Sequence, residues 1–346
     1  MGLAALSDPG IARTWGQDSA PSLKQSASAA GLFFGSPLFS QDLKRPQVLE
    51  LYAQQCSLVV AAVYMNRVQP EPDRFDFSVA DQVRDFAKGH GMKLRGHPLV
   101  YGKVTPDWVQ ALNRGQARDA LERHVKTVAG RYRGQMYSWD VVNEAIQPKP
   151  RGMYHEWPWF KLLGPEYIEI AFHVAAAADP NALLAYNDFG LEADGEEHER
   201  KRDAVFRMLH GLRKRNVPVG ALGIQSHIGP QFEGKKLPQF LQRVREQLGL
   251  KIIVSELDVR DWKLPGDIAS RDAGVARAYR TYLDTVLPNP ALVAVITWGL
   301  YDGDTWLSRT SPREDGLPVR ALPFDADLRP KPAMAAMIES FARRRV

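Results

Sequence analysis

Short runs of apolar and β-branched residues alternate, from residue 21 onward, with longer segments whose apolar residues recur at helical spacing. This alternation is typical of parallel strands joined by crossover helices. Eight runs fit a strand, and they span residues 32–37, 57–65, 93–101, 138–144, 183–189, 222–228, 251–258 and 292–300. The pattern therefore predicts an α/β fold built from strand–helix units.

The segments between these runs have the apolar spacing of helices. Examples are Leu121, Val125, Val128 and Tyr132, then Phe240, Val244 and Leu248, and finally Met334, Met337 and Phe341. An open doubly wound sheet would usually carry a glycine-rich phosphate loop after its first strand. Residues 34–37, Phe-Gly-Ser-Pro, offer no such loop. Closure into a (β/α)8 TIM barrel is the simplest architecture, and active sites of such barrels lie at the carboxyl ends of the strands.

The domain organisation follows from where this pattern begins. Residues 1–20 are polar, rich in small residues and without a period, and we interpret them as an N-terminal arm. Residues 21–346 are expected to form one catalytic domain, since no linker interrupts them. The segment 308–325 contains three prolines and is expected to be a long loop over the barrel mouth.

Composition excludes several classes of protein. The chain has 45 Lys and Arg against 40 Asp and Glu, scattered along the sequence, so we expect no nucleic-acid partner. No run reaches the about 18 apolar residues of a membrane span, so no membrane partner is expected. The single cysteine, Cys56, excludes an internal disulfide and a cysteine metal cluster. We expect the protein to be a monomer. Met1 to Leu6 show no signal peptide, because they lack a basic start and a long apolar region.

Two glutamates stand at predicted strand ends. The fourth strand ends at Glu144, and Glu256 lies near the end of the seventh. Retaining glycoside hydrolysis uses two carboxylates about 5–5.5 Å apart, one attacking the anomeric carbon and one protonating the leaving oxygen. A single glutamate at a strand end would more simply cap a helix or pair with arginine. Two of them, each with suitable neighbours, favour catalysis, with Glu144 as acid/base and Glu256 as nucleophile.

The neighbours of these glutamates support that interpretation. Asn143 precedes Glu144 and can bind a sugar 2-hydroxyl, an interaction that strengthens in the transition state. The sixth strand ends near His227, which should lie beside Glu256, and Asp258 can orient that imidazole. The histidine could instead be an ordinary buried polar residue, but the three residues together predict a Glu–His–Asp relay that keeps Glu256 ionised.

Aromatic residues also gather at predicted strand ends, where sugar rings can stack on them. They are Tyr101, Trp108, Tyr186, Trp298 and Trp306. Packing in the core remains an equal alternative for Trp108.

Taken in order, the motifs resemble glycoside hydrolase family 10, the endo-β-1,4-xylanase family, from about residue 22 to the end. The matching segments are Ser22-Leu23-Lys24, Phe75-Asp76-Phe77 with Ala80-Asp81, Arg95-Gly96-His97, 139–144, Tyr186-Asn187-Asp188, 223–227, Glu256 to Asp258, Trp298 with Trp306, and Pro330-Lys331-Pro332. The resemblance implies a β-linked polysaccharide or oligosaccharide as substrate and no metal or organic cofactor. It also implies a secreted or periplasmic enzyme.

The resemblance further implies roles for individual residues. Glu144 would be the acid/base and Glu256 the nucleophile, with support from Asn143, His227 and Asp258. Contacts to the glycone, the sugar on the nonreducing side of the cleaved bond, would come from His97, Gln225, Trp298 and Trp306. Tyr186 and Asn187 would face the aglycone on the other side. Independently of the resemblance, we also expect Tyr101 and Lys103 to contact substrate.

The chain departs from the family on the distal glycone side. After the second strand the family carries Glu-Asn and then Lys-Trp, which hold the second xylose, whereas this chain has Val60, Ala61, Tyr64 and Met65. After the third strand the family's Trp is Tyr101, and its His-Ser-Gln is replaced by residues 102–104, Gly-Lys-Val. We therefore expect an atypical subsite that tolerates a hydroxymethyl group or a branch. The alternatives are the same chemistry on a gluco-configured or decorated β-glycoside, and a carbohydrate-binding barrel that no longer catalyses.

Overall fold

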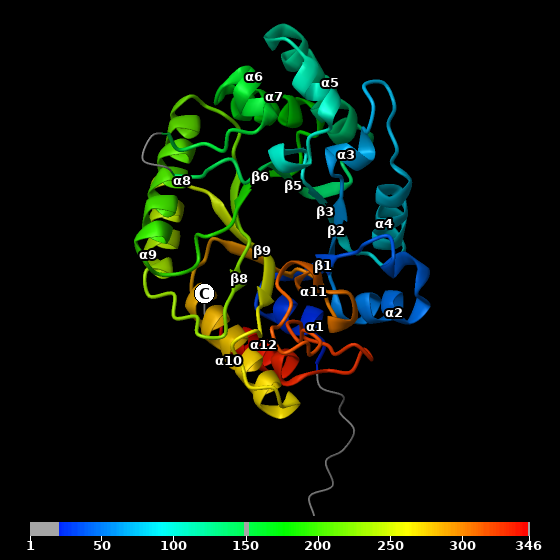
Figure 1. Ribbon diagram of the computed structural model, residues 1–346, viewed down its shortest axis with the longest axis vertical. Coiled ribbons are helices and arrows are strands. Elements are labelled where there is room, and N and C mark those ends of the chain that lie inside the picture. Colours follow the sequence, from blue (N-terminus) through cyan, green and yellow to red (C-terminus); the bar gives the residue numbers. More distant parts are fainter. Residues whose placement is uncertain (1–20, 149–151, 345–346) are drawn as a thin grey trace, which may run out of the picture.

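The computed structural model describes residues 21–148 and 152–344, so the predicted arm, residues 1–20, lies outside the described residues. Within them, parallel strands form one sheet in the order β10-β1-β2-β3-β5-β6-β7-β9, and β10 also pairs with β9. This last pairing closes the sheet into an eight-stranded barrel, which Figure 1 shows surrounded by helices. The predicted (β/α)8 TIM barrel is confirmed.

Each predicted strand corresponds to a strand of the barrel. Their observed bounds are β1 Phe33–Pro37, β2 Leu58–Ala62, β3 Lys93–His97, β5 Met136–Asn143, β6 Leu183–Asp188, β7 Ala221–Ile224, β9 Lys251–Val259 and β10 Leu292–Thr297. Two predicted strands are interrupted. The third breaks at Pro98, which has no backbone N–H for the ladder, and continues as β4, Val100–Tyr101. The sixth breaks at Ser226, whose φ of 67° turns the chain before β8, His227–Ile228.

Helices connect the strands and cover the barrel. Their bounds are α1 Leu23–Ala29, α2 Pro46–Gln55, α3 Met65–Val68, α4 Ser78–Gly89, α5 Arg114–Arg131, α6 Pro158–Leu163, α7 Glu166–Ala178, α8 Glu196–Lys214, α9 Leu237–Arg243, α10 Ile268–Val286, α11 Leu307–Thr310 and α12 Pro332–Arg343. Short 3-10 turns occur at η1 Asp42–Lys44, η2 Gly102–Val104, η3 Asp107–Ala111 and η5 Asp302–Asp304, and η4, Val244–Leu248, is a π-helical turn. None of the described helices is long and apolar enough to cross a membrane.

Local signals in the sequence place several of these helices. The side chains of Ser22 and Asn113 accept hydrogen bonds from the backbone N–H groups of Gln25 and Gln116, respectively. The glutamine side chains in turn accept from the backbone N–H groups of Ser22 and Asn113, so α1 and α5 both begin with a capping box. The π-helical turn η4 ends at Gly249, which adopts the left-handed conformation that glycine allows without steric cost. Such caps satisfy backbone groups that a helix end leaves without partners.

Two apolar cores hold the barrel together. The larger core lies between the strands and the helices. The smaller core fills the barrel interior with side chains from β2, β6, β7, β9 and β10, namely Leu58, Val60, Ala185, Ala221, Ile253, Ala294 and Ile296. Polar side chains from β3 and β5 are also fully buried: Arg95 donates to Ser138 at 2.8 Å and forms an ion pair with Asp140. Buried charges of this kind require a partner, which here is Asp140.

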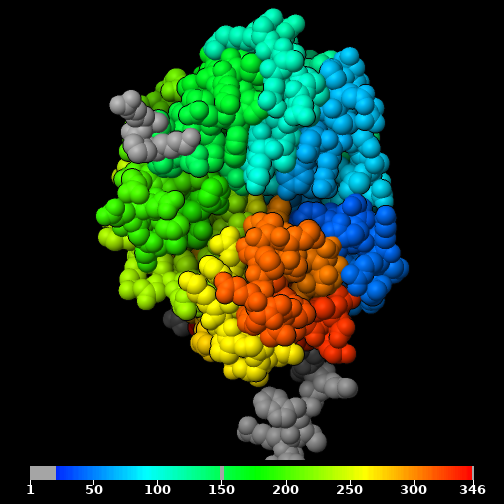
Figure 2. Space-filling model, viewed as in Figure 1, coloured from blue at the N-terminus to red at the C-terminus, as the bar shows by residue number. Residues whose placement is uncertain are grey.

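The segment after β10 packs onto the barrel rather than forming a second body. Leu307, Val319, Ala321 and Leu322 form a small buried cluster with Trp306 against it. In Figure 2 this segment, in orange, lies on the face shown, between the yellow residues of α10 and the blue N-terminal residues. It therefore contributes one side of the barrel mouth.

We expect Gly96→Ala to destabilise the barrel. A Cβ at Gly96 would lie 1.9 Å from Cζ3 of Trp139, a fully buried indole that has little freedom to move. Crowding of this kind should lower the free energy of unfolding by about 1–3 kcal/mol in a denaturant titration. Gly89→Ala is the matched control, since nothing lies within 4 Å of its added Cβ, and it should raise stability by about 0.4–1 kcal/mol. Equal effects of the two variants would contradict this packing argument.

Candidate active site

A cavity of about 320 Å³ opens at the carboxyl ends of the strands. It is lined by Tyr64, His97, Tyr101, Lys103, Asn143, Glu144, Phe189, Gln225, His227, Glu256, Arg260, Trp298 and Trp306. Both predicted catalytic glutamates therefore face one cavity, at the position where TIM barrels carry their active sites.

Glu144 follows the last residue of β5 and is held in an unusual backbone conformation. Its φ of 55° is rare for a residue with a side chain and costs about 1–3 kcal/mol. Its backbone N–H donates to the carbonyl of Asn187 at 2.8 Å, which fixes the turn. Its carboxylate accepts from the Tyr101 hydroxyl at 2.7 Å and from Nε2 of Gln225 at 2.9 Å. Strain of this kind tends to persist at functional sites.

Glu256 lies within β9 and its side chain is buried, with 6% exposed. Asn187 donates from Nδ2 to its Oε1 at 2.7 Å, and the same Nδ2 donates to Oδ1 of Asn143 at 2.9 Å. Ser255 orients Asn187 through a 2.6 Å hydrogen bond to its Oδ1. Because Gln225 donates to both Asn143 and Glu144, one hydrogen-bond network connects the two glutamates.

The predicted Glu–His–Asp arrangement is present in the geometry. Nε2 of His227 lies 3.3 Å from Oε2 of Glu256, and its Nδ1 lies 3.0 Å from Oδ1 of Asp258. Asp258 also accepts from the indole N–H of Trp306 at 2.7 Å, and this indole packs 4.9 Å from the His227 ring. Burial by itself lowers the pKa of His227, but the carboxylates of Asp258 and Glu256 outweigh it and raise that pKa to about 10. The imidazole therefore carries a positive charge beside Glu256 at neutral pH.

His97 forms the opposite wall of the cavity. Its Nδ1 lies 2.9 Å from Oδ2 of Asp140, the residue that also pairs with Arg95 below it, and 4.0 Å from Oε1 of Glu256. Trp298 packs edge-on against His97, with ring centroids 5.1 Å apart. The polar layer in the barrel interior therefore fixes the position of a cavity histidine.

Some predicted residues lie behind the wall rather than in it. Asp258 and Asn187 are fully buried and act on Glu256 and His227 from outside the lining. The position of Tyr186 corrects the predicted contact with the aglycone, since its ring is fully buried and its hydroxyl accepts from the N–H of Ala145 at 3.1 Å and donates to Asp188. Trp108 lies away from this cavity and packs against the main core.

Three lining residues were not predicted as site residues: Tyr64, Phe189 and Arg260. Phe189 is 40% exposed, the first residue after β6, with the Lys201 ammonium 3.9 Å from its ring centroid. Arg260 is the first residue after β9. Phe189 is the last residue of the predicted strand 183–189 and Arg260 lies two residues beyond the predicted strand 251–258, so the available signal was a place near a predicted strand end.

Four residues, at positions 60, 61, 64 and 65, stand where the chain departs from the family that it resembles. We call these positions the replaced glycone grip, and they bring few polar groups to the cavity. Val60, Ala61 and Met65 are buried in the apolar cores and do not line it. Tyr64 does line it, edge-on to His97 with ring centroids 5.6 Å apart, and burial raises its pKa.

The loop after β4 packs on a tryptophan. A Cβ on Gly102 would lie 2.5 Å from Cβ of Trp157, so this indole packs directly on the glycine backbone. Tyr101 contacts the same indole edge-on at 5.4 Å. Only a residue without a side chain fits at position 102 in this packing.

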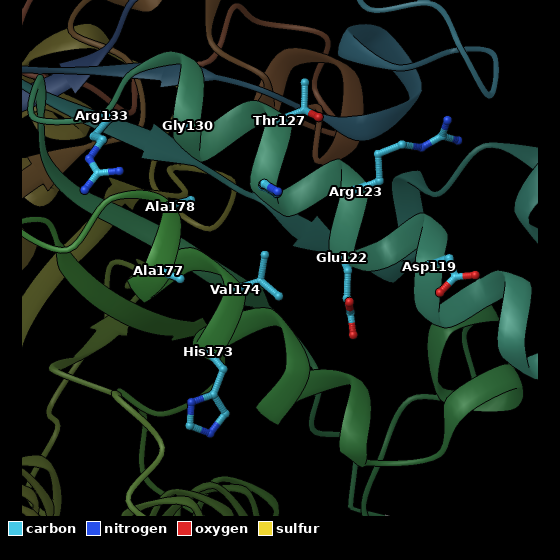
Figure 3. Close-up of a pocket in the computed structure, with 11 residues that line it drawn as sticks. Asp119, Glu122, Arg123, Thr127, Gly130, Arg133, His173, Val174, Ala177 and Ala178 are labelled. Atoms are coloured by element: carbon cyan, nitrogen blue, oxygen red, sulfur yellow. The ribbon is translucent and has the colours of Figure 1, made fainter.

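A larger groove of about 770 Å³ lies elsewhere, on the outer wall between α5 and α7. Figure 3 shows Val174, Ala177 and Ala178 on α7 and the charged residues Asp119, Glu122 and Arg123 on α5. It is remote from the carboxyl ends of the strands, where barrel chemistry takes place. Within the described ranges, no three or more His, Cys, Asp or Glu side chains are grouped so that they could hold a metal ion.

The profile of glycosyl hydrolase family 10 matches residues 22–340. The chain belongs to this family. It is therefore a glycoside hydrolase. Among relatives of family 10, the endo-1,4-beta-xylanase B of Thermotoga neapolitana is 36% identical over 277 residues, covering 79% of this chain and 76% of that protein. Endo-1,4-beta-xylanase 5 of Pyricularia oryzae is 32% identical over 351 residues, covering 97% of this chain and 84% of that protein.

Solved structures of family 10 agree with the fold. Xylanase 10B from Thermotoga petrophila RKU-1, solved in complex with xylobiose, has a TM-score of 0.86 and 30% identity, covering 94% of this chain and 98% of that one. Xylanase 10B from Thermotoga maritima has a TM-score of 0.85 and 30% identity, covering 92% and 98%. The similarity thus covers the whole barrel.

We expect the charge on His227 to make stability depend on pH. Its folded-state pKa of about 10 lies above the about 6.5 of an unfolded histidine. Its contribution to stability is therefore complete below about pH 6.5 and is lost as the pH rises through about 10. Asp258→Asn removes a carboxylate that raises this pKa, so the variant should lose less stability than the wild type between neutral and alkaline pH.

The measurement compares denaturant titrations of both proteins across that pH range, because other titrating groups are common to the two. An NMR titration of the imidazole gives the pKa directly. A His227 that titrates near its unfolded value in the wild type would contradict the assignment.

Proposed function

We propose that this protein is a retaining β-glycoside hydrolase of the endo-β-1,4-xylanase type, with Glu256 as nucleophile and Glu144 as acid/base. One observation carries the proposal: two carboxylates from different strands line the same cavity, and each is held by its own set of donors. The relatives of this chain are endo-1,4-beta-xylanases, which supports a β-linked polysaccharide or oligosaccharide as substrate.

The environment of Glu256 suits attack on the anomeric carbon. Asn187 donates to one carboxylate oxygen and the His227 imidazolium faces the other, so the carboxylate is fixed in position beside the cavity. The carboxylate bonds to the anomeric carbon while the bond to the leaving oxygen breaks, which produces a glycosyl-enzyme ester. Asp258 acts as a positioning residue, because it is buried behind the cavity wall and holds His227 rather than touches the sugar. The indole N–H of Trp306 donates to Asp258 and so holds that carboxylate in turn.

Glu144 serves both halves of the reaction. In the first half its carboxylic acid gives a proton to the leaving oxygen, and in the second the resulting carboxylate takes a proton from the water that cleaves the ester. Tyr101 and Gln225 hold its two oxygens, which fixes the direction of the proton transfer. Two displacements at the same carbon retain its configuration.

Neighbouring residues are assigned to sugar binding. Asn143 lies between the two glutamates in the hydrogen-bond network and can donate to the 2-hydroxyl. His97, Gln225, Trp298 and Trp306 line the cavity for glycone contacts, and Lys103 extends the wall. Phe189, exposed at the rim, offers a stacking face for the aglycone.

The substrate preference is expected to differ from that of a standard xylanase. Tyr64 is the one residue of the replaced glycone grip, positions 60, 61, 64 and 65, that lines the cavity, so the polar grip on a second xylose is missing in the described residues. A gluco-configured or decorated β-glycan is therefore the second candidate substrate. A binding protein without catalysis is disfavoured, since binding alone requires neither the buried His227 nor its two carboxylates.

A 2-fluoro glycoside with an activated leaving group should trap a covalent adduct on Glu256. The fluorine slows both displacements, and the good leaving group keeps the first one fast enough for the ester to accumulate. Intact mass spectrometry measures the adduct, and peptide mapping should locate it at residue 256. The variant Glu256→Gln is the control and should remain unlabelled.

Running xylo- and gluco-configured disaccharide probes in parallel also tests the substrate preference. Comparable or faster labelling by the gluco-configured probe is expected if the glycone site tolerates a hydroxymethyl group. Labelling by the xylo-configured probe alone would rule out that tolerance, and no labelling by either would rule out the proposed mechanism.

Glu144→Ala should affect substrates according to their leaving group. With a sugar as leaving group, kcat/KM should fall by about 10²–10⁴-fold, because that oxygen needs the proton. An aryl glycoside with an acidic phenol needs little protonation, so its glycosylation step should be much less affected. Steady-state kinetics on both substrates measure the difference, and added azide should restore turnover by replacing the base-assisted water. A uniform loss on both substrates would contradict the acid assignment.

A further inference from the structure

Arg260 lines the catalytic cavity but has no role in the chemistry proposed above. It is the first residue after β9, and its backbone N–H donates to the carbonyl of Ile228 at 2.9 Å, beside His227 on β8. This places its side chain at the rim of the cavity, on the side that also holds the nucleophile.

The guanidinium of Arg260 has no anion among the described residues. Its Nε is buried without a hydrogen-bond partner, and no carboxylate there pairs with it. The nearby Asp261 is no substitute, because Arg271 forms an ion pair with it and Arg313 lies 3.8 Å from it. A planar guanidinium in this condition is suited to hold a carboxylate through two parallel hydrogen bonds.

Lys103 is a second cation in the same cavity without a partner in the described chain. It belongs to η2, next to β4, and in the strand order β3 and β9 lie on opposite sides of the closed barrel. The lining carboxylates, Glu144 and Glu256, bind other residues instead. A sugar chain that crosses the mouth would therefore pass two free cations.

We propose that Arg260 is a binding site for the carboxylate of a uronic acid residue carried by the β-glycan substrate, with Lys103 as a second, weaker contact on the opposite wall. The proposal rests on the proposed function and narrows its substrate class to acidic β-glycans. The uronic acid can stand as a branch on the chain or as a unit within it, since both present the same carboxylate.

Calorimetric binding to the full chain carrying Glu256→Gln tests this, because that variant cannot cleave its ligand by the proposed route. Three oligosaccharides are compared: a β-1,4-xylo-oligosaccharide with a glucuronyl branch, the same compound after reduction of its carboxyl group, and a β-1,4-linked oligoglucuronate. The acidic branched compound should bind about ten-fold more tightly than its reduced form. Added salt should bring the ratio of these two affinities closer to one.

Variants of Arg260 locate the effect. Arg260→Gln should bring the affinity ratio close to one. Arg260→Lys keeps the charge but loses the planar guanidinium that donates two parallel hydrogen bonds, so it should retain part of the preference for the acidic compound. Arg309→Gln is the matched control, since Arg309 lies in α11, its side chain is 67% exposed and it does not line the cavity, and it should leave the ratio unchanged. Lys103→Gln should reduce the ratio less than Arg260→Gln does.

Equal affinity for the acidic and reduced compounds, with the oligoglucuronate binding no better, would overturn the proposal. A preference that survives Arg260→Gln in a variant with unchanged thermal unfolding would overturn the assignment to this residue. Tight binding of the oligoglucuronate but not of the branched compound would place the uronic acid within the chain. Because binding is measured without turnover, a failure to trap a glycosyl-enzyme would count against the proposed function alone.

Discussion

The parallel pairing of β10 with both β1 and β9 is the constraint on which the rest of the structure depends. Without this closure, the strands that carry Glu144 and Glu256 would belong to an open sheet, and a cavity lined from all sides would not exist. Closure also buries the inner faces of the strands, so Val60 of β2 and Ile253 of β9 belong to one apolar cluster in the barrel interior. Loops at the carboxyl ends then become the walls of a single mouth.

Above that layer the barrel holds charges that are costly to bury. They are tolerated because each has a partner: Arg95 with Asp140, His227 with Asp258 and Glu256, and Glu256 with Asn187. The same bonds connect the strands, so the arrangement of the cavity side chains depends on the polar interior of the barrel. Arg260 departs from this rule in the described chain, and for that reason it indicates a ligand rather than a structural role.

Much of the fold could be predicted, because strands of a parallel sheet buried on both faces appear as apolar runs of recognisable length. Two predicted strands were too long, because the chain leaves the hydrogen-bond ladder of the sheet at Pro98 and at Ser226. Pro98 lacks a backbone N–H and Ser226 is left-handed, and neither property interrupts an apolar pattern in the sequence. The site could be predicted where residues stand at strand ends. The prediction for Tyr186 was wrong because alternate residues of a strand point to opposite faces of the sheet. Its ring points into the larger core between the strands and the helices.

Sequence alone determined the number of barrel strands, the helix that follows each of them, and the position of the two glutamates at strand ends, since periodicity and residue type are local properties of the chain. Tertiary structure decided which polar side chains meet. Asn187 contacts Asn143 and Glu256, and Trp306 contacts Asp258, across separations that no local pattern encodes. It also decided that Arg260 has no partner among the residues that the structure describes, because whether a charge is paired depends on side chains that only folding brings near it.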